Sequence, residues 1–262
     1  MDDIDAGAVI QAEHATWTRS APAYMESTAK LTSHAVGHLI DMAGLTRESR
    51  AVEIGCGPGH ITEKMAETGA TVIGVDLVPA MIETARVLYP EIEFIDANAE
   101  QLPFADDSLD AVLVNFTIHH FARPEVACTE IRRVLKPGGR FVFAGPIEQH
   151  EFGAFVAGLT AHHTMDVLAH GPLYLGATRA DYESLIEAAG FTNYEVDVRQ
   201  LTLRLPDLEP LLQTGWDMCG LSELPLETQH QIRETTIQHA EPYRTSDGYV
   251  FPDRIVVGRA IK

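Results

Sequence analysis

The stretch that decides the fold is Ala51-Val52-Glu53-Ile54-Gly55-Cys56-Gly57-Pro58-Gly59. A short apolar run with a β-branched centre breaks into glycines at Gly55, Gly57 and Gly59, and a helical pattern starts at Pro58. This order predicts a strand, a tight turn and a helix N-terminus. Glycine suits such a turn because a side chain would keep a ligand away from the backbone. The exposed amides at the helix start favour carboxylate or phosphate oxygens.

A second strand is predicted over residues 71–75, and Asp76 stands at its carboxyl end. A carboxylate at this place can accept hydrogen bonds from both hydroxyls of a ribose. The spacing fits one βαβ unit and predicts a nucleotide-cofactor site. The G-x-G-x-x-G fingerprint of NAD-binding proteins is not met, because His60 stands where the third glycine would be.

Three later motifs complete the pattern: Ala99-Glu100-Gln101-Leu102-Pro103-Phe104, Asp107-Ser108-Leu109-Asp110-Ala111-Val112 and Leu135-Lys136-Pro137-Gly138-Gly139. Together with the glycine run, their order over roughly residues 45–145 resembles the class I S-adenosylmethionine-dependent methyltransferases. The resemblance implies an α/β fold with a Rossmann-like, doubly wound, seven-stranded sheet whose last strand is antiparallel. It also implies S-adenosyl-L-methionine as cofactor and S-adenosyl-L-homocysteine as product.

The resemblance assigns roles near the start of the sheet. Glu53 would orient the glycine loop or accept from the methionine ammonium, Asp76 would hold the ribose, and Leu77 would pack against the adenine ring. Asn98 stands where the family has an acidic residue that bonds the adenine amine; its carbonyl can accept the same bond, although Asp96 is a competing candidate. The full set of predicted cofactor-binding residues is Glu53, Gly55, Cys56, Gly57, Gly59, Asp76, Leu77, Asn98, Ala99, Asn115 and Tyr24.

Two of these positions have alternatives. A tyrosine in an N-terminal helix of similar proteins reaches over the cofactor, and here Trp17 competes with Tyr24 for that role. The residue that follows the fourth strand commonly contacts the cofactor, which favours Asn115 or Phe116. Cys56 occupies a variable position of the loop and also suits a small packing residue.

The helix and strand pattern divides the chain into four parts. Residues 1–45 read as an N-terminal helical cap, 46–146 as the cofactor-binding core, 147–252 as lid insertions that include one core strand, and 253–262 as the final core strand. Strands are predicted near 50–54, 71–75, 91–95, 109–115, 139–145, 191–205 and 254–261. Helices are predicted within 6–45 and near 59–68, 79–89, 124–134, 150–169, 179–189, 207–219 and 226–240.

Composition excludes several partners. The chain has 262 residues, 19 of them basic and 38 acidic, which gives a formal charge of −19 that would repel nucleic acid. Its 3 cysteines are unpatterned and favour a reducing compartment, so a cytoplasmic location is expected. The acidic N-terminus is unlike a signal peptide, and no apolar run approaches the roughly 18 residues of a membrane span.

No metal site is predicted. His34 and His38 have helical spacing, and His162, His163 and His170 cluster in the first lid insertion. No cysteine or carboxylate cluster and no H-E-x-x-H pattern accompanies them.

The predicted activity is methyl transfer to a small, largely apolar metabolite, at oxygen or carbon, by direct displacement beneath the lid. The protein would supply alignment, exclusion of water and, where needed, a base. His119 and His120 follow the fourth strand, and at most one of them would act as that base, with packing as the competing role. The apolar lid residues that suggest a greasy pocket are Phe152, Phe155, Leu159, Tyr174, Trp216 and Met218.

Three alternatives stay open at this point. The methyl acceptor can be a protein or another macromolecule; the chain can bind the cofactor without methylating anything, because fold alone does not fix chemistry; or it can be an NAD-dependent oxidoreductase, against which His60 argues. The sequence leaves the oligomeric state open.

Overall fold

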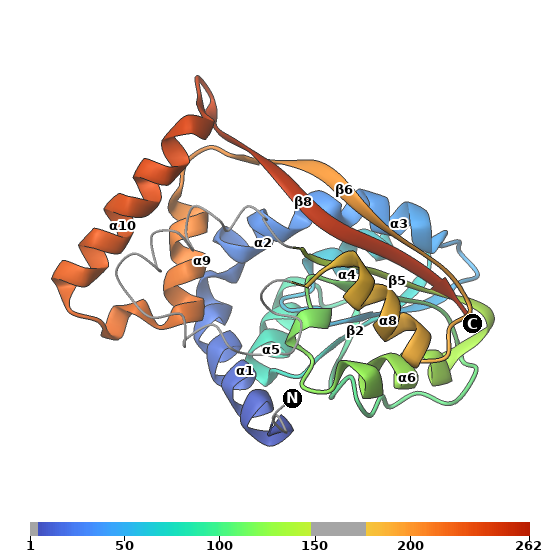
Figure 1. Ribbon diagram of the computed structural model, residues 1–262. Coiled ribbons are helices and arrows are strands. Elements are labelled where there is room, and N and C mark those ends of the chain that lie inside the picture. The colour runs from blue at the N-terminus through green and yellow to red at the C-terminus, as the bar shows by residue number, and fades with distance from the viewer. Residues whose placement is uncertain (1–4, 148–176) are drawn as a thin grey trace.

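The computed structural model describes residues 5–147 and 177–262, and its centre is one mixed β-sheet (Figure 1). Three of its inner strands, over residues 50–54, 71–76 and 109–115, are short and mostly apolar, and they are buried on both faces, as is typical of parallel strands. The strands are β1 (Arg50–Ile54), β2 (Thr71–Asp76), β3 (Glu93–Asp96), β4 (Leu109–Asn115), β5 (Leu135–Pro146), β6 (Asn193–Leu205), β7 (Arg244–Thr245) and β8 (Gly248–Ile261).

The strand order is β3-β2-β1-β4-β5-β8-β6, and the short β7 pairs with β8 outside this path. Strands β1 to β5 pair in parallel, whereas β8 runs antiparallel to both β5 and β6. The chain order reverses between β1 and β4, and ligands of doubly wound sheets bind at such a switch point, beyond the carboxyl ends of the strands. The predicted doubly wound sheet with its antiparallel last strand is confirmed. Within the described residues the sheet has eight strands and not the seven predicted, because the short β7 pairs with the extended start of β8.

Helices cover both faces of the sheet (Figure 1). On one face α3 and α4 share a core with β1, β2, β4 and β5, and α5 packs on β2 and β3. On the other face lie α6 and α8. Their bounds are α3 (Val36–Ala43), α4 (His60–Ala66), α5 (Pro79–Leu88), α6 (Pro124–Val134) and α8 (Arg179–Ala188).

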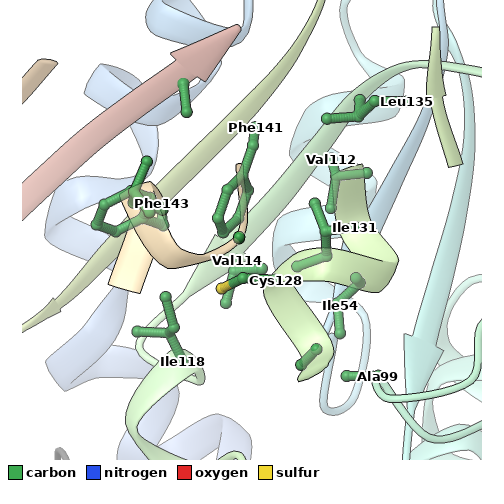
Figure 2. Close-up of a cluster of buried hydrophobic side chains, with 14 of the residues drawn as sticks. Ile54, Ala99, Val112, Val114, Ile118, Cys128, Ile131, Leu135, Phe141 and Phe143 are labelled. Carbon is green, nitrogen blue, oxygen red and sulfur yellow. The ribbon is translucent and has the colours of Figure 1, made fainter. Parts of the chain in front are cut away.

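The core beneath α6 is apolar and rich in aromatic side chains. Figure 2 shows Phe141 and Phe143 of β5 beside Val114 of β4, with Ile131 and Cys128 of α6 packed over them; all five are fully buried. Alternate residues of β4 and β5 point into this core, while their neighbours face α3. This packing fixes the register of the strands, because a slip of one residue would exchange the two faces.

The N-terminal helices and the elements between β6 and β8 form a second body of structure beside the sheet (Figure 1). Strands β6 and β8 pair from Asn193↔Ile261 to Leu205↔Tyr249. At the Leu205↔Tyr249 end of this pairing, apolar side chains of both strands pack with α9, α10 and Leu31 in a separate cluster. The remaining helices are α1 (Ala6–Ser20), η1 (Ala21–Glu26), α2 (Thr28–Thr32), η2 (Ser33–Ala35), η3 (Ile118–His120), α9 (Glu209–Cys219), η5 (Leu221–Glu223), α10 (Leu226–Ala240) and η6 (Glu241–Tyr243).

Some boundaries differ from the sequence-based expectation. Strand β8 begins at Gly248 and not near residue 254, because β6 is long enough to pair with the extra residues. Strand β5 begins at Leu135, which pairs with Leu109 before an irregularity in register. The helix predicted near 150–169 lies outside the described residues. Within 5–147 and 177–262, no helix combines the length and the apolar character that crossing a bilayer requires.

Candidate functional site

A cavity opens between the carboxyl ends of β1 to β4 and the N-terminal helices. The space not filled by atoms is about 1050 Å³ when the solvent in its open mouth is counted. Its walls come from α1, η1 and α2, from the loops that follow the first four strands, and from α9. The described lining residues are Ile10, Glu13, Trp17, Tyr24, Thr28, Thr32, Ile54, Gly55, Gly57, Asp76, Leu77, Val78, Met81, Ala97, Asn98, Ala99, Glu100, Phe116, Thr117, His119, His120, Phe121, Ala122 and Met218.

The loop after β1 presents bare backbone to this cavity. Gly55 has a φ of 71°, and a Cβ there would lie 2.2 Å from Cγ2 of Thr117. Gly57 has a φ of 52°, and a Cβ there would lie 3.5 Å from the ring of Tyr24. The loop therefore needs glycine both for its backbone conformation and for the approach of neighbouring groups.

Asp76 ends β2 and bridges the first two strand-end loops. Its Oδ2 accepts from the amide of Gly57 at 2.8 Å, and its Oδ1 accepts from the amide of Val78 at 2.9 Å. Burial raises the pKa of Asp76 to about 6, against the lowering effect of these amide hydrogen bonds. Each carboxylate oxygen can accept more than one hydrogen bond, so Asp76 retains acceptor capacity toward the cavity that it lines.

Glu53 lies behind the cavity wall. It is 1% exposed, and the hydroxyl of Thr62 on α4 donates to its Oε2 at 2.5 Å. Burial raises the pKa of Glu53 to about 8, and the nearby Asp76 adds to the rise, while the Thr62 hydrogen bond opposes it. The side chain thus ties β1 to α4. Its predicted contact with a methionine ammonium stays a prediction.

The predicted adenine end of the site lies after β3. Leu77, Asn98 and Ala99 line the cavity, whereas the competing Asp96 is exposed. Oδ1 of Asn98 accepts from the amide of Glu100 at 2.9 Å, which closes a local turn and fixes the orientation of its side chain.

The end of β4 separates its two candidate residues. Nδ2 of Asn115 donates to the carbonyl of Thr32 at 3.2 Å, so that this buried side chain joins β4 to the N-terminal cap. Phe116 lines the cavity, with a φ of 48° that is uncommon for a residue with a side chain. This turn sets Thr117 against Gly55, whose carbonyl accepts from the Thr117 hydroxyl at 3.4 Å.

Both aromatic candidates of the N-terminal cap, Trp17 and Tyr24, line the cavity, with ring centroids 6.0 Å apart. Burial raises the pKa of the Tyr24 hydroxyl, and the neighbouring Asp76 and Glu53 raise it further. His119 and His120 also line the cavity, and their ring centroids are 4.1 Å apart. The structure thus brings the histidines of the core and the aromatic residues of the cap into one chamber.

Cys56 and Gly59, like Glu53 and Asn115, are placed outside the lining. Cys56 is a buried free thiol that packs with Ile82 and Phe94. Gly59 is the N-cap residue of α4, and a Cβ there would lie 2.7 Å from the Phe94 ring. Their effect on a ligand would be exerted through the shape of the loop.

The charge of the cavity suits a cation. Among its described lining residues, the ionisable side chains are the carboxyl groups of Glu13, Asp76 and Glu100, Tyr24 and the histidines, with no lysine or arginine. S-adenosylmethionine carries a sulfonium and an ammonium, and a cation gains from nearby carboxylates in a site of low dielectric constant. The glycine loop, Asp76 and this charge pattern together fit the cofactor.

Several lining residues were not predicted from the sequence. Glu13, Thr28 and Thr32 come from the N-terminal cap. Glu13 precedes Trp17 by one helical turn, and this spacing was the signal in the sequence that could have indicated a polar pair on that face.

The described residues hold no group of three His, Cys, Asp or Glu side chains that could ligate a metal ion.

Residues 52–143 match the family model described as a methyltransferase domain. The chain contains a class I S-adenosylmethionine-dependent methyltransferase domain. The matched segment runs from β1 to β5 and includes the glycine loop, Asp76 and both histidines. The family that the sequence motifs resembled is thereby confirmed.

Curated relatives and solved structures agree with this assignment. The demethylmenaquinone methyltransferase of Renibacterium salmoninarum is 34% identical over 117 residues, which is 45% of this chain and 49% of the relative. The YcgJ protein of Bacillus subtilis has a TM-score of 0.63 at 22% identity and covers 88% of this chain and 98% of its own. The [4+2]-cyclase SpnF has a TM-score of 0.57 at 19% identity, over 87% of this chain and 79% of its own.

The relative and the solved structures support different conclusions. The chain spans about half the length of the Renibacterium relative. The two solved structures, at these identities, share the fold of the methyltransferase domain.

Proposed function

We propose that the protein transfers a methyl group from S-adenosylmethionine to a small, largely apolar metabolite, at oxygen or carbon. The observation that carries this proposal is that a single cavity joins the glycine loop and Asp76 to an apolar wall made of Trp17, Phe116 and Met218. Cofactor and acceptor would meet there, under helices that exclude water. The demethylmenaquinone methyltransferase relative supports an acceptor of this class.

The residues have separable tasks. Asp76 and the amides of the glycine loop would bind the ribose and the amino-acid part, and Leu77, Asn98 and Ala99 would hold the adenine. The bound cofactor supplies a methyl group that its sulfonium charge has already activated. The protein then contributes alignment of the acceptor and, where the acceptor carries a proton, a base from His119 or His120.

We further propose that residues 1–45 and 147–252 form the cap and lid of the site. Of the described parts, α1, η1, α2 and α9 support this division, since each contributes lining residues from outside the sheet. Of the lid residues predicted to form a greasy pocket, Met218 lines the cavity and Trp216 packs in the cluster of α9 and α10. Phe152, Phe155, Leu159 and Tyr174, with His162, His163 and His170, lie outside the described residues.

Calorimetric titration with S-adenosylmethionine and S-adenosylhomocysteine tests the cofactor. Asp76→Ala should weaken both by about 100-fold, because two hydrogen bonds to a charged group are worth roughly 3 kcal/mol or more. Asp96→Ala is the matched control: Asp96 is the register partner of Asp76 on β3 but is exposed, and its loss should leave binding unchanged. Binding of NAD in place of the sulfur compounds would overturn the proposal.

Mass analysis of candidate acceptors then separates the remaining functions. A gain of one methyl group on a small apolar compound, with release of S-adenosylhomocysteine, is the expected result. Methylation of a protein would favour the macromolecular alternative. Tight cofactor binding without any turnover over a broad panel would favour a protein that uses the cofactor for another purpose.

A further inference from the structure

A buried carboxylate from the N-terminal cap meets a histidine of the core inside the cavity. Glu13, on α1, is 4% exposed, and its Oε2 lies 3.0 Å from Nδ1 of His120 in the loop after β4. The two residues are 107 positions apart in sequence and both line the cavity. Removing a carboxylate from water is costly unless donors face it, so this contact needs an explanation.

Trp17 fixes the carboxylate in place. Its Nε1 donates to the same Oε2 of Glu13 at 2.8 Å. Its ring stands edge-on to the imidazole of His120, with centroids 5.2 Å apart and an interplanar angle of 86°. The carboxylate is thus held between an indole and an imidazole, and α1 is pinned to the loop after β4.

The contact distinguishes the two adjacent histidines. The structure shows the short approach to Glu13 at Nδ1 of His120, whereas His119 lies beside it with an interplanar angle of 42°. The negative charge of a carboxylate 3.0 Å from one imidazole nitrogen favours the tautomer that carries the proton on that nitrogen. The other nitrogen, on the opposite side of the ring, is then a proton acceptor.

We propose that Glu13 is a positioning residue that keeps the proton of neutral His120 on Nδ1, so that Nε2 accepts a proton from the methyl acceptor. The inference rests on the proposed methyl transfer and deepens it: the acceptor atom is one that carries a proton, such as the oxygen of a hydroxyl group. The described lining offers no lysine or arginine to pair with an anionic acceptor, which favours a neutral one.

The hydroxyl oxygen of the acceptor forms a bond to the methyl carbon while the bond from that carbon to sulfur breaks, and the electron pair of the broken bond stays on sulfur. The hydroxyl proton passes to Nε2 of His120. Glu13 keeps its negative charge and stabilises the resulting imidazolium.

Nitrogen-15 NMR of the histidine rings tests this assignment without knowledge of the acceptor. Spectra are recorded on the full chain saturated with S-adenosylhomocysteine, at about pH 8, where an ordinary imidazole is neutral. His120→Asn identifies the signals of His120. In the unmodified protein the Nδ1-protonated form should dominate.

Two substitutions of Glu13 and one control complete the experiment. Glu13→Gln should remove the dominance of the Nδ1-protonated form, and Glu13→Asp should restore part of it. Glu26→Gln, which changes an exposed carboxylate of the same cap, should leave the His120 signals as they were. An unchanged tautomer in Glu13→Gln, or an Nε2-protonated ring in the unmodified protein, would overturn the inference.

Calorimetry on the same samples separates the two proposals. If S-adenosylhomocysteine binds the unmodified protein and Glu13→Gln with the same affinity, the tautomer result tests only the role of Glu13. If S-adenosylhomocysteine does not bind the unmodified protein, the proposed function is wrong, and the inference that rests on it is wrong as well. Loss of binding confined to Glu13→Gln would show that Glu13 supports the fold of the cap or the cofactor, and would also overturn the inference.

Discussion

Replacing Glu53 with glutamine should change how stability depends on pH. In the folded protein Glu53 has a pKa of about 8, against an ordinary value of 4.5, because it is buried beside Asp76. Between these two values the folded state keeps a proton that the unfolded state has lost. The free energy of unfolding therefore falls as pH rises through this window and becomes flat on either side of it.

The size of the effect follows from the shift. One pKa unit corresponds to about 1.4 kcal/mol, so the contribution of Glu53 to the free energy of unfolding should fall by about 3 kcal/mol between roughly pH 5 and pH 7. Glutamine can still accept from the Thr62 hydroxyl, which lies 2.5 Å from Glu53, but it does not titrate. The stability of Glu53→Gln relative to the unmodified protein should therefore improve steadily over that range.

Urea unfolding at several pH values measures this difference directly. Glu93→Gln provides the control, because Glu93 is an exposed carboxylate on β3. Its curve of stability against pH should follow that of the unmodified protein. Parallel curves for Glu53→Gln as well would refute the reasoning and show that Glu53 is ionised in the folded protein.

Two further substitutions test the packing around the site. In thermal melts, Gly55→Ala should lower the melting temperature by more than Gly138→Ala. Both glycines have a positive φ, but a Cβ at Gly55 would lie 2.2 Å from Thr117, whereas a Cβ at Gly138 would meet open space. Equal losses would show that the backbone conformation alone determines the effect. His34→Phe should cost about 3 kcal/mol, because its Nε2 lies 2.6 Å from Oδ2 of the wholly buried Asp253. Adding Asp253→Leu should recover most of that loss in urea unfolding, and no recovery would contradict the role given to the pair.

The parts of the site that the sequence predicted belong to short stretches of chain. Gly55, Gly57 and Asp76 follow the ends of β1 and β2, and a strand that ends in glycine or aspartate is visible in the order of residues alone. All three line the cavity. The parallel sheet was predictable for the same reason, since alternating strands and helices of these lengths have few other ways to bury their apolar faces.

Contacts between distant segments could not be predicted in this way. Glu13 gave a local signal toward Trp17, but nothing in the sequence pairs it with His120. Asn115 and Phe116 were equal candidates until the backbone turn at Phe116 sent one to the cavity and the other to the cap. The choice between Asn98 and Asp96 likewise depended on which side chain the end of β3 turns inward.

The sequence by itself determined the order of strands and helices, the need for glycine after β1 and the placement of Asp76, because these depend on local backbone conformation and on the period of apolar residues. Only the tertiary structure decided that α1 lies across the carboxyl edge of the sheet and brings Glu13 to within 3.0 Å of His120. That juxtaposition depends on how the cap packs on the loop after β4, and packing between segments 107 residues apart leaves no periodic trace in either one.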